Sequence, residues 1–72
     1  MQFETKFKNQ ARLQDRWPEE FCPEIIVSSQ TDKFYYLTFI DGEDRDTQKI
    51  HRKEVDERFI DFYSDEALKA RL

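Results

Sequence analysis

The chain has 72 residues, which is enough for one small hydrophobic core and too few for two. Its 16 acidic and 12 basic residues give a net charge of −4, so it lacks the basic footprint that a nucleic-acid backbone needs. An aromatic fraction of 15% indicates a folded domain rather than a disordered chain, and the single cysteine, Cys22, excludes an internal disulfide.

The N-terminal part of the chain is the hardest to assign. Residues 2–8 alternate in polarity, with the period of a half-buried strand. Over residues 8–17 the apolar positions fit two patterns, because Leu13 and Trp17 are four apart, as on a helix, while Ala11 and Leu13 are two apart, as on a strand. We favour the strand and keep the helix as the alternative.

A turn and a second strand follow. Pro18 fixes its own φ angle and favours an extended Trp17, which predicts a turn over residues 17–21. Pro23 then suits the beginning of a strand. Residues 24–28 contain three consecutive β-branched residues, whose stiff side chains suit a pleated sheet.

The clearest strand lies in the middle of the sequence. All residues from 34 to 40 are aromatic, aliphatic or threonine, so both faces of this strand are apolar and we expect it inside the sheet. Asp41 and Gly42 follow at once, and a glycine at this place supplies the positive φ of a tight reversal. A short return strand over residues 47–51 is expected after the turn.

The apolar spacing changes in the C-terminal part. From Lys53 onward apolar residues recur at helical spacing, which predicts one apolar helix face. That face comprises Val55, Phe59, Phe62 and Tyr63. Ser64 followed by Asp65 and Glu66 is a typical helix start, and it predicts a short C-terminal helix over residues 65–72.

Three segments together resemble the Tudor domain family. The segments are Phe21–Val27, Phe34–Gly42 and Ile50–Val55, and the middle one matches the family's alternating aromatic strand ended by Asp-Gly. The resemblance covers about residues 8–57, and the length of the chain predicts a single domain over residues 1–72. Within it, residues 8–57 would form a small five-stranded SH3-like barrel and residues 58–72 a C-terminal helical extension.

Tudor domains commonly bind methylated lysine or arginine in an aromatic cage, whose ring faces attract the cation. On this resemblance Phe39 falls on a cage position and Asp41 on the acidic position beside it. The remaining cage positions fall on Leu13, Cys22 and Glu43, so the implied aromatic cage is incomplete.

We therefore expect a non-enzymatic binding module for a protein or peptide partner, including a basic or methylated, histone-type tail. The predicted ligand-binding residues are Trp17, Phe21, Tyr35, Phe39 and Asp41. Three of them also have a structural interpretation: Phe39 as a core residue, Asp41 as a turn residue and Trp17 as a cover over one end of the fold. The only pairing that would suggest nucleophilic catalysis is Cys22 with His51, and their spacing does not indicate that they meet.

The alternative is a structural or assembly domain without a cage, or a small acidic phage or bacterial inhibitor of a host factor. The assembly interface would then be the helix face around Phe59, Phe62 and Tyr63. No cofactor and no metal are expected, and the chain should be a monomer or a weak dimer. The sequence contains no membrane-length apolar run and no signal-peptide pattern, which favours an intracellular protein. It would be nuclear if it binds chromatin and otherwise cytoplasmic.

Overall fold

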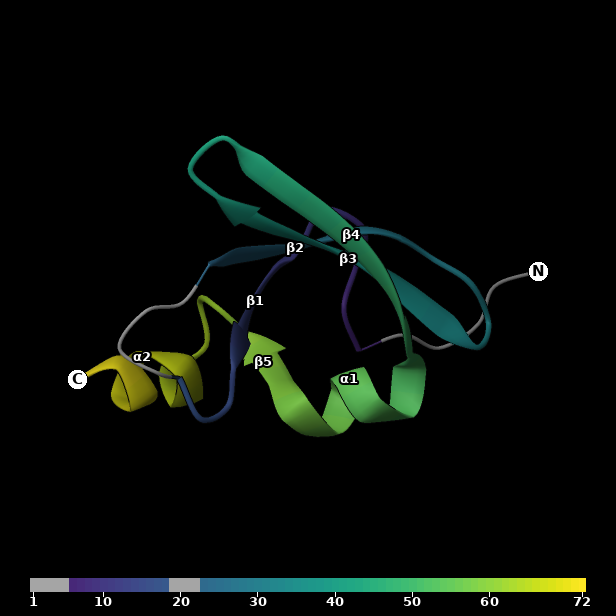
Figure 1. Ribbon diagram of the computed structural model, residues 1–72. Coiled ribbons are helices and arrows are strands. Elements are labelled where there is room, and N and C mark those ends of the chain that lie inside the picture. The colour runs from purple at the N-terminus through teal and green to yellow at the C-terminus, as the bar shows by residue number, and fades with distance from the viewer. Residues whose placement is uncertain (1–5, 19–22) are drawn as a thin grey trace.

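The computed structural model describes residues 6–18 and 23–72, which form a five-stranded antiparallel sheet with two short helices (Figure 1). The elements in chain order are β1 (Arg12–Asp15), β2 (Glu24–Gln30), β3 (Phe34–Asp41), β4 (Asp44–His51), α1 (Arg52–Arg58), β5 (Phe59–Asp61) and α2 (Asp65–Arg71). The strand order across the sheet is β4-β3-β2-β1-β5. The expected mainly β fold with five strands and a short C-terminal helix is confirmed.

The β3–β4 hairpin is the longest paired unit. The two strands pair without a shift from Phe34 opposite His51 to Asp41 opposite Asp44. Gly42 has a φ of +63°, so the expected reversal is confirmed, and a glycine at the first turn position matches the twist that hairpins need. The return strand is longer than predicted, since it begins at Asp44 rather than at Thr47.

Strand β1 settles the ambiguity in the N-terminal part. Residues 12–15 are a strand, and Gln10, with a φ of +71°, precedes it. The strand predicted for residues 2–8 is wrong where it can be seen, because Lys6 and Phe7 form a bend; the rest of that prediction lies outside the described residues. The Phe7 side chain is buried although its backbone is not part of a strand, so its burial does not depend on strand pairing.

The helix predicted through Phe59, Phe62 and Tyr63 is wrong after Arg58. Helix α1 ends there, and Phe59 takes extended angles of φ −112° and ψ 152°. Phe59–Asp61 then pairs antiparallel with β1, so a strand of the sheet lies inside the segment expected to be a helical extension. Phe59 and Ile60 are both buried. Strand β5 lies between the core and helix α2, so both of its faces are covered.

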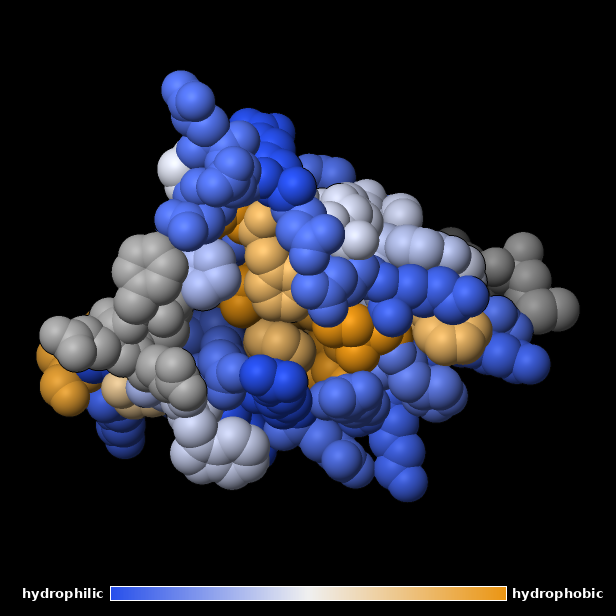
Figure 2. All heavy atoms as spheres, in the orientation of Figure 1, coloured by the Kyte–Doolittle hydropathy of each residue, from blue (hydrophilic) through white to orange (hydrophobic). Residues whose placement is uncertain are grey.

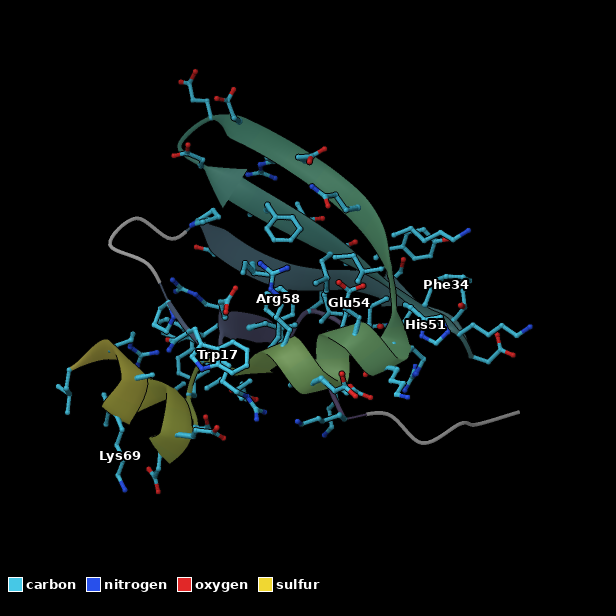
Figure 3. The ribbon with its side chains drawn as sticks, turned by 60° about the horizontal axis from the view of Figure 1, so that its bottom comes forward. Trp17, Phe34, His51, Glu54, Arg58 and Lys69 are labelled. Carbon is cyan, nitrogen blue, oxygen red and sulfur yellow. The ribbon has the colours of Figure 1, made fainter. Side chains whose placement is uncertain are left out.

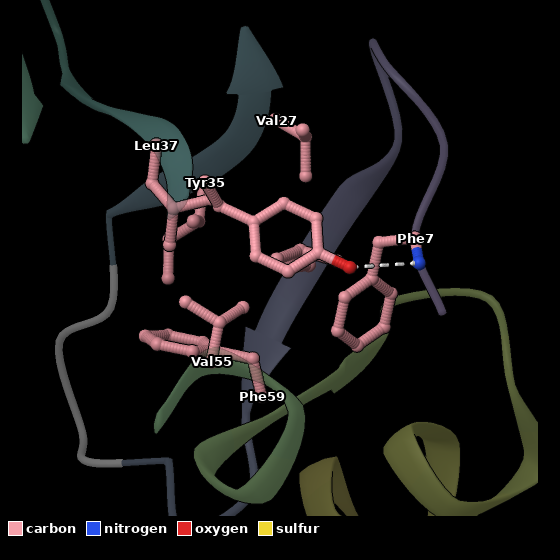
Figure 4. Close-up of a cluster of buried hydrophobic side chains, with 8 residues drawn as sticks. Phe7, Val27, Tyr35, Leu37, Val55 and Phe59 are labelled. Atoms are coloured by element: carbon pink, nitrogen blue, oxygen red, sulfur yellow. Dashed lines mark hydrogen bonds between the residues drawn. The ribbon is translucent and has the colours of Figure 1, made fainter. Parts of the chain in front are cut away.

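The core lies between the sheet and helix α1 (Figure 4). Its buried residues are Phe7, Leu13, Ile25, Val27, Tyr35, Leu37, Val55 and Phe59. The Tyr35 ring lies 6.0 Å from the Phe7 ring, and its hydroxyl lies 3.4 Å from the Phe7 backbone nitrogen, which donates to it. Val55, the buried residue of α1, closes the core from the helix side.

Helix α2 is fastened to β1 through Gln14. The Ser64 side chain caps this helix as predicted, accepting a hydrogen bond from the Ala67 N–H. The buried Gln14 amide donates to the Ala67 carbonyl at 3.0 Å and accepts from Arg71 at 2.6 Å. A buried polar side chain that is satisfied on both sides fixes the register of two elements.

The sheet has two edges. Strands β4 and β5 lie at its ends, and the pairing does not close it into a barrel. In the part of the chain that the structure describes, no helix is long and apolar enough to cross a membrane.

Candidate functional site

A groove of about 900 Å³ opens beside the core. Figure 2 shows it as a hollow with an apolar floor and a hydrophilic rim. The apolar side chains that line it are Leu13, Trp17, Pro18, Pro23, Ile25, Phe39, Ile50, Phe59, Phe62 and Ala70. The polar ones are Arg12, Gln14, Asp15, Gln48, Arg58 and Arg71.

The groove exists because the core-facing side of β4 becomes polar toward the turn. Residues opposite each other in antiparallel strands share a face, so this side of the hairpin carries three successive pairs. The pairs are Tyr35 with Ile50, Leu37 with Gln48 and Phe39 with Asp46. Only the first pair is apolar on both strands, and the Phe39 ring is consequently half-buried rather than covered.

Among the residues that the structure describes, three arginines and one carboxylate line the groove. The carboxylate, Asp15, accepts from Arg58 Nε at 3.2 Å. This ion pair is exposed, so it contributes at most about 1 kcal/mol to stability. Within the described residues this contact uses one of the five N–H donors of Arg58, which leaves donors for an incoming acceptor.

The other two arginines are held in place by the Phe62 ring. The guanidinium carbons of Arg12 and Arg71 lie 3.8 Å and 3.9 Å from its centroid. Arg71 is fixed further by hydrogen bonds to the Phe62 carbonyl and to Gln14. The Nε of Arg12 is buried and has no hydrogen-bond partner within the described residues. These two positive charges are therefore positioned before any ligand arrives.

Trp17 lies at the edge of the groove and is 73% exposed. Its backbone N–H donates to Asp15 Oδ1 at 2.9 Å, which fixes the bend that presents the indole. Figure 3 shows Trp17 on the same side of the molecule as Arg58. An exposed tryptophan beside an apolar groove is typical of a binding anchor, because tryptophan is enriched among residues that dominate binding energy.

Of the five predicted ligand-binding residues, the structure brings two together, since Trp17 and Phe39 both line the groove. The prediction for Tyr35 is wrong: its side chain is 0% exposed, because it lies on the core face of β3 and packs against Phe7. Asp41 is exposed at the hairpin turn and is not among the lining residues. Phe21 lies outside the described residues.

The alternative assembly interface is also dispersed by the fold. Phe59 is buried in the core, and Phe62 packs between arginines. Only Tyr63 is strongly exposed, at 78%, and its ring meets Phe62 edge-on at 5.1 Å. These three residues do not form the single apolar helix face expected from their spacing, because Phe59 lies in β5 and the other two lie in the turn that follows it.

His51 has a structural role. Its Nδ1 accepts from the Lys53 N–H and caps helix α1, and its ring lies 5.6 Å from Phe34. Cys22 lies outside the described residues. Among the described residues, the groove lining includes no serine, cysteine, histidine or lysine, and no group of three metal-ligating side chains occurs.

Sequence reasoning missed the three arginines. Arg12, Arg58 and Arg71 lie on β1, α1 and α2, and nothing in their spacing relates them. The pairing of β1 with β5 brings these elements together, and β5 was itself not predicted.

No family model matches this chain, and neither does any curated protein or any solved structure.

Proposed function

We propose that this chain is a non-enzymatic binding module that holds an extended segment of a partner protein in the groove. The observation that carries the proposal is the combination of an apolar floor with a rim of three arginines in one cavity. The partner segment that fits this chemistry has an apolar anchor residue with acidic residues around it.

The apolar part of the groove suits one large side chain. Phe39 and Ile50 are half-buried in the free protein, so an incoming ring or branched chain would complete their burial. Burying apolar surface contributes about 25 cal/mol per Å². The groove volume lies within the range of ligand pockets, about 300–1,000 Å³.

The charge of the groove is opposite to that of the whole chain. The chain carries a net charge of −4, whereas the described residues that line the groove include three guanidinium groups and one carboxylate. Local charges decide the preference, because screening in physiological salt reduces interactions beyond about 8 Å. Arginine also binds carboxylates through paired hydrogen bonds, which favours aspartate or glutamate on the partner.

The resemblance to Tudor domains enters the proposal at the level of the fold. The strand order β4-β3-β2-β1-β5 is compatible with a bent SH3-like sheet. A bound segment would occupy the open side between the two edge strands, β4 and β5. A strand-like ligand at this place would bring the sheet nearer to the closed barrel that the resemblance implies.

Methyl-lysine recognition is the second candidate. It is favoured by one observation, that Trp17 and Phe39 line the same groove and could offer two ring faces to a cation. The three arginines oppose it, because like charges in one site repel. We therefore place the acidic partner first.

Three probe peptides separate these candidates. The acidic probe is the acetylated peptide Glu-Glu-Val-Phe-Val-Glu-Glu, and the other two carry lysine or trimethyl-lysine in place of glutamate. Two-dimensional NMR titrations of the labelled protein should show saturable shifts of the Trp17 indole and of Phe39 with the acidic probe only. Tighter binding of the trimethyl-lysine probe would establish the second candidate, and no binding of any probe would reject the module.

A matched pair of variants tests the role of charge. Arg58→Gln removes a cation from the groove, whereas Lys69→Gln removes one from an exposed site on α2 outside the lining (Figure 3). Loss of a charge-assisted contact of about 1.5–3 kcal/mol would weaken binding of the acidic probe by about 10- to 150-fold in the first variant. The second variant should bind as the wild type does, and equal losses in both would reject the groove as the site.

A further inference from the structure

Strand β4 is a long, exposed edge next to the groove. It has eight residues, of which seven are exposed, and β3 is its only neighbour in the sheet order. Two of its residues, Gln48 and Ile50, line the groove. A segment lying in the groove along β4 would therefore run beside a strand edge that no other described strand occupies.

The register shows which backbone groups point outward. The hairpin turn has two residues, so Asp41 and Asp44 form the first hydrogen-bonded pair, and the pattern then alternates along the ladder. The N–H and C=O groups of Arg45, Thr47 and Lys49 consequently point away from β3. Among the described residues no strand pairs with them. An extended peptide is the natural partner for such a row of donors and acceptors.

The charges along β4 disfavour a second copy of this chain as that partner. The outer-face residues Arg45, Thr47, Lys49 and His51 are neutral or positive, and the groove-face residues Asp44, Asp46, Gln48 and Ile50 are neutral or negative. Antiparallel pairing of two copies about a two-fold axis keeps each face, so only residues of the same face can lie opposite each other. No register of self-pairing then places a positive residue opposite a negative one, and several place like charges together.

The same pattern selects a different partner. A segment that carries an acidic side chain on its outer face would place it opposite Arg45 or Lys49, which are both exposed. Opposite charges in directly opposed cross-strand positions stabilise a sheet by about 0.2–1 kcal/mol for each pair. On the other face, an apolar residue of the segment would reach Ile50 and Phe39 in the groove.

We infer that the partner segment binds by strand addition: an acidic, extended segment of another protein pairs with the β4 edge and becomes a sixth strand. This inference rests on the proposed function, since it specifies how the groove holds its ligand. Main-chain hydrogen bonds to β4 would provide affinity, and the groove and the two outer-face cations would provide specificity.

The test uses the acidic probe peptide in two N-methylated forms. One form is methylated on both valine amides, and the other on the phenylalanine and inner glutamate amides. Successive amides of a strand point to opposite sides, so only one form retains the donors that face β4. We expect one form to bind at least about tenfold more weakly than the other, because a lost backbone hydrogen bond and a steric clash affect that form alone.

The protein side is tested with Thr47→Pro and its control Thr47→Ala. Both variants lack the hydroxyl, and only proline also lacks the outward N–H; proline is tolerated at an edge whose N–H faces solvent. Binding should be lost with proline and kept with alanine. In the unmodified protein, peptide saturation should slow hydrogen exchange of the Arg45, Thr47 and Lys49 amides and leave Asp46 and Gln48 unchanged, since their amides already face β3.

Two results would overturn the inference, and they differ in what else they reject. If the acidic probe shifts Trp17 and Phe39 but both methylated forms bind equally and the three edge amides gain no protection, the peptide binds in the groove without adding a strand. The proposed function then stands alone. If the acidic probe does not bind at all, the inference and the proposed function both fail.

Discussion

Strands β3 and β4 are the two arms of one hairpin and differ in almost everything except length. Both have eight residues, and they pair residue for residue. In β3, Tyr35 and Leu37 are 0% exposed, whereas in β4 seven residues are exposed and Ile50 is half-buried. One arm is therefore a wall of the core and the other is a free edge.

The difference shows that strand pairing and side-chain burial depend on different contacts. Cross-strand hydrogen bonds place the two arms at the same geometry, but burial depends on what covers each face. The core face of β3 packs against Phe7 and Val55 of helix α1, while Gln48 and Asp46 at the matching positions of β4 are exposed. Stability should accordingly depend on β3 and binding on β4.

The largest expected effect is in the core arm. Leu37→Ala should lower the free energy of unfolding by about 2–5 kcal/mol, because it leaves a cavity beneath a fully buried position. The matched control is Gln48→Ala, at the directly opposed position on the same face, with an expected change within about 0.5 kcal/mol. Urea unfolding followed by circular dichroism measures both, and similar losses would contradict the division between the arms.

The turn that joins the arms comes next. Gly42→Ala should cost about 1–2 kcal/mol, because a β-carbon is unfavourable at a φ of +63°. Apart from Gly42 and its two chain neighbours, no atom of the described residues lies within 4 Å of the position a β-carbon would take, so the loss would come from the backbone alone. Gly42→Asn should lose less in the same unfolding experiment, since asparagine tolerates this conformation; an equal loss would point to a steric cause instead.

A smaller effect is expected from the buried hydroxyl of the core arm. Tyr35→Phe removes the acceptor for the Phe7 N–H and a contact to Asp56 Oδ1 at 3.4 Å, which should cost about 0.5–1.5 kcal/mol. The comparison variant is Tyr36→Phe, on the opposite face of the same strand, where we expect a change under about 0.5 kcal/mol. Thermal unfolding of the two proteins side by side decides the point, and an unchanged Tyr35→Phe protein would contradict it.

The smallest effect concerns the outer face. The hydroxyls of Thr38 and Thr47 lie 2.9 Å apart across the two arms, and both are outside the core. Thr47→Val should change stability by less than about 0.5 kcal/mol, because the remaining Thr38 hydroxyl can exchange this bond for one to water. A double-mutant cycle with Thr38→Val measures the coupling, and a value above about 1 kcal/mol would show that the edge strand contributes more to stability than its exposure suggests.

Predictions from sequence succeeded where the signal is local. The apolar run of β3, the glycine at the turn and the Ser64 cap each depend on a few neighbouring residues, and the structure has all three. Strand β5 could not be found in this way. It has three residues, its apolar positions have helical spacing, and it is a strand only because β1 supplies a partner more than forty residues earlier in the chain.

The candidate site follows the same division. The sequence by itself made Trp17 and Phe39 candidates for binding: Trp17 because tryptophan is enriched in binding sites, and Phe39 through its position in the resemblance to Tudor domains. Only the tertiary structure decided that these two line one groove, that Tyr35 belongs to the core and that Arg12, Arg58 and Arg71 come together at the rim. The physical reason is that residue type and local spacing fix hairpins, caps and strands, whereas a groove is formed by elements that meet through non-local pairing and by the side chains left uncovered there.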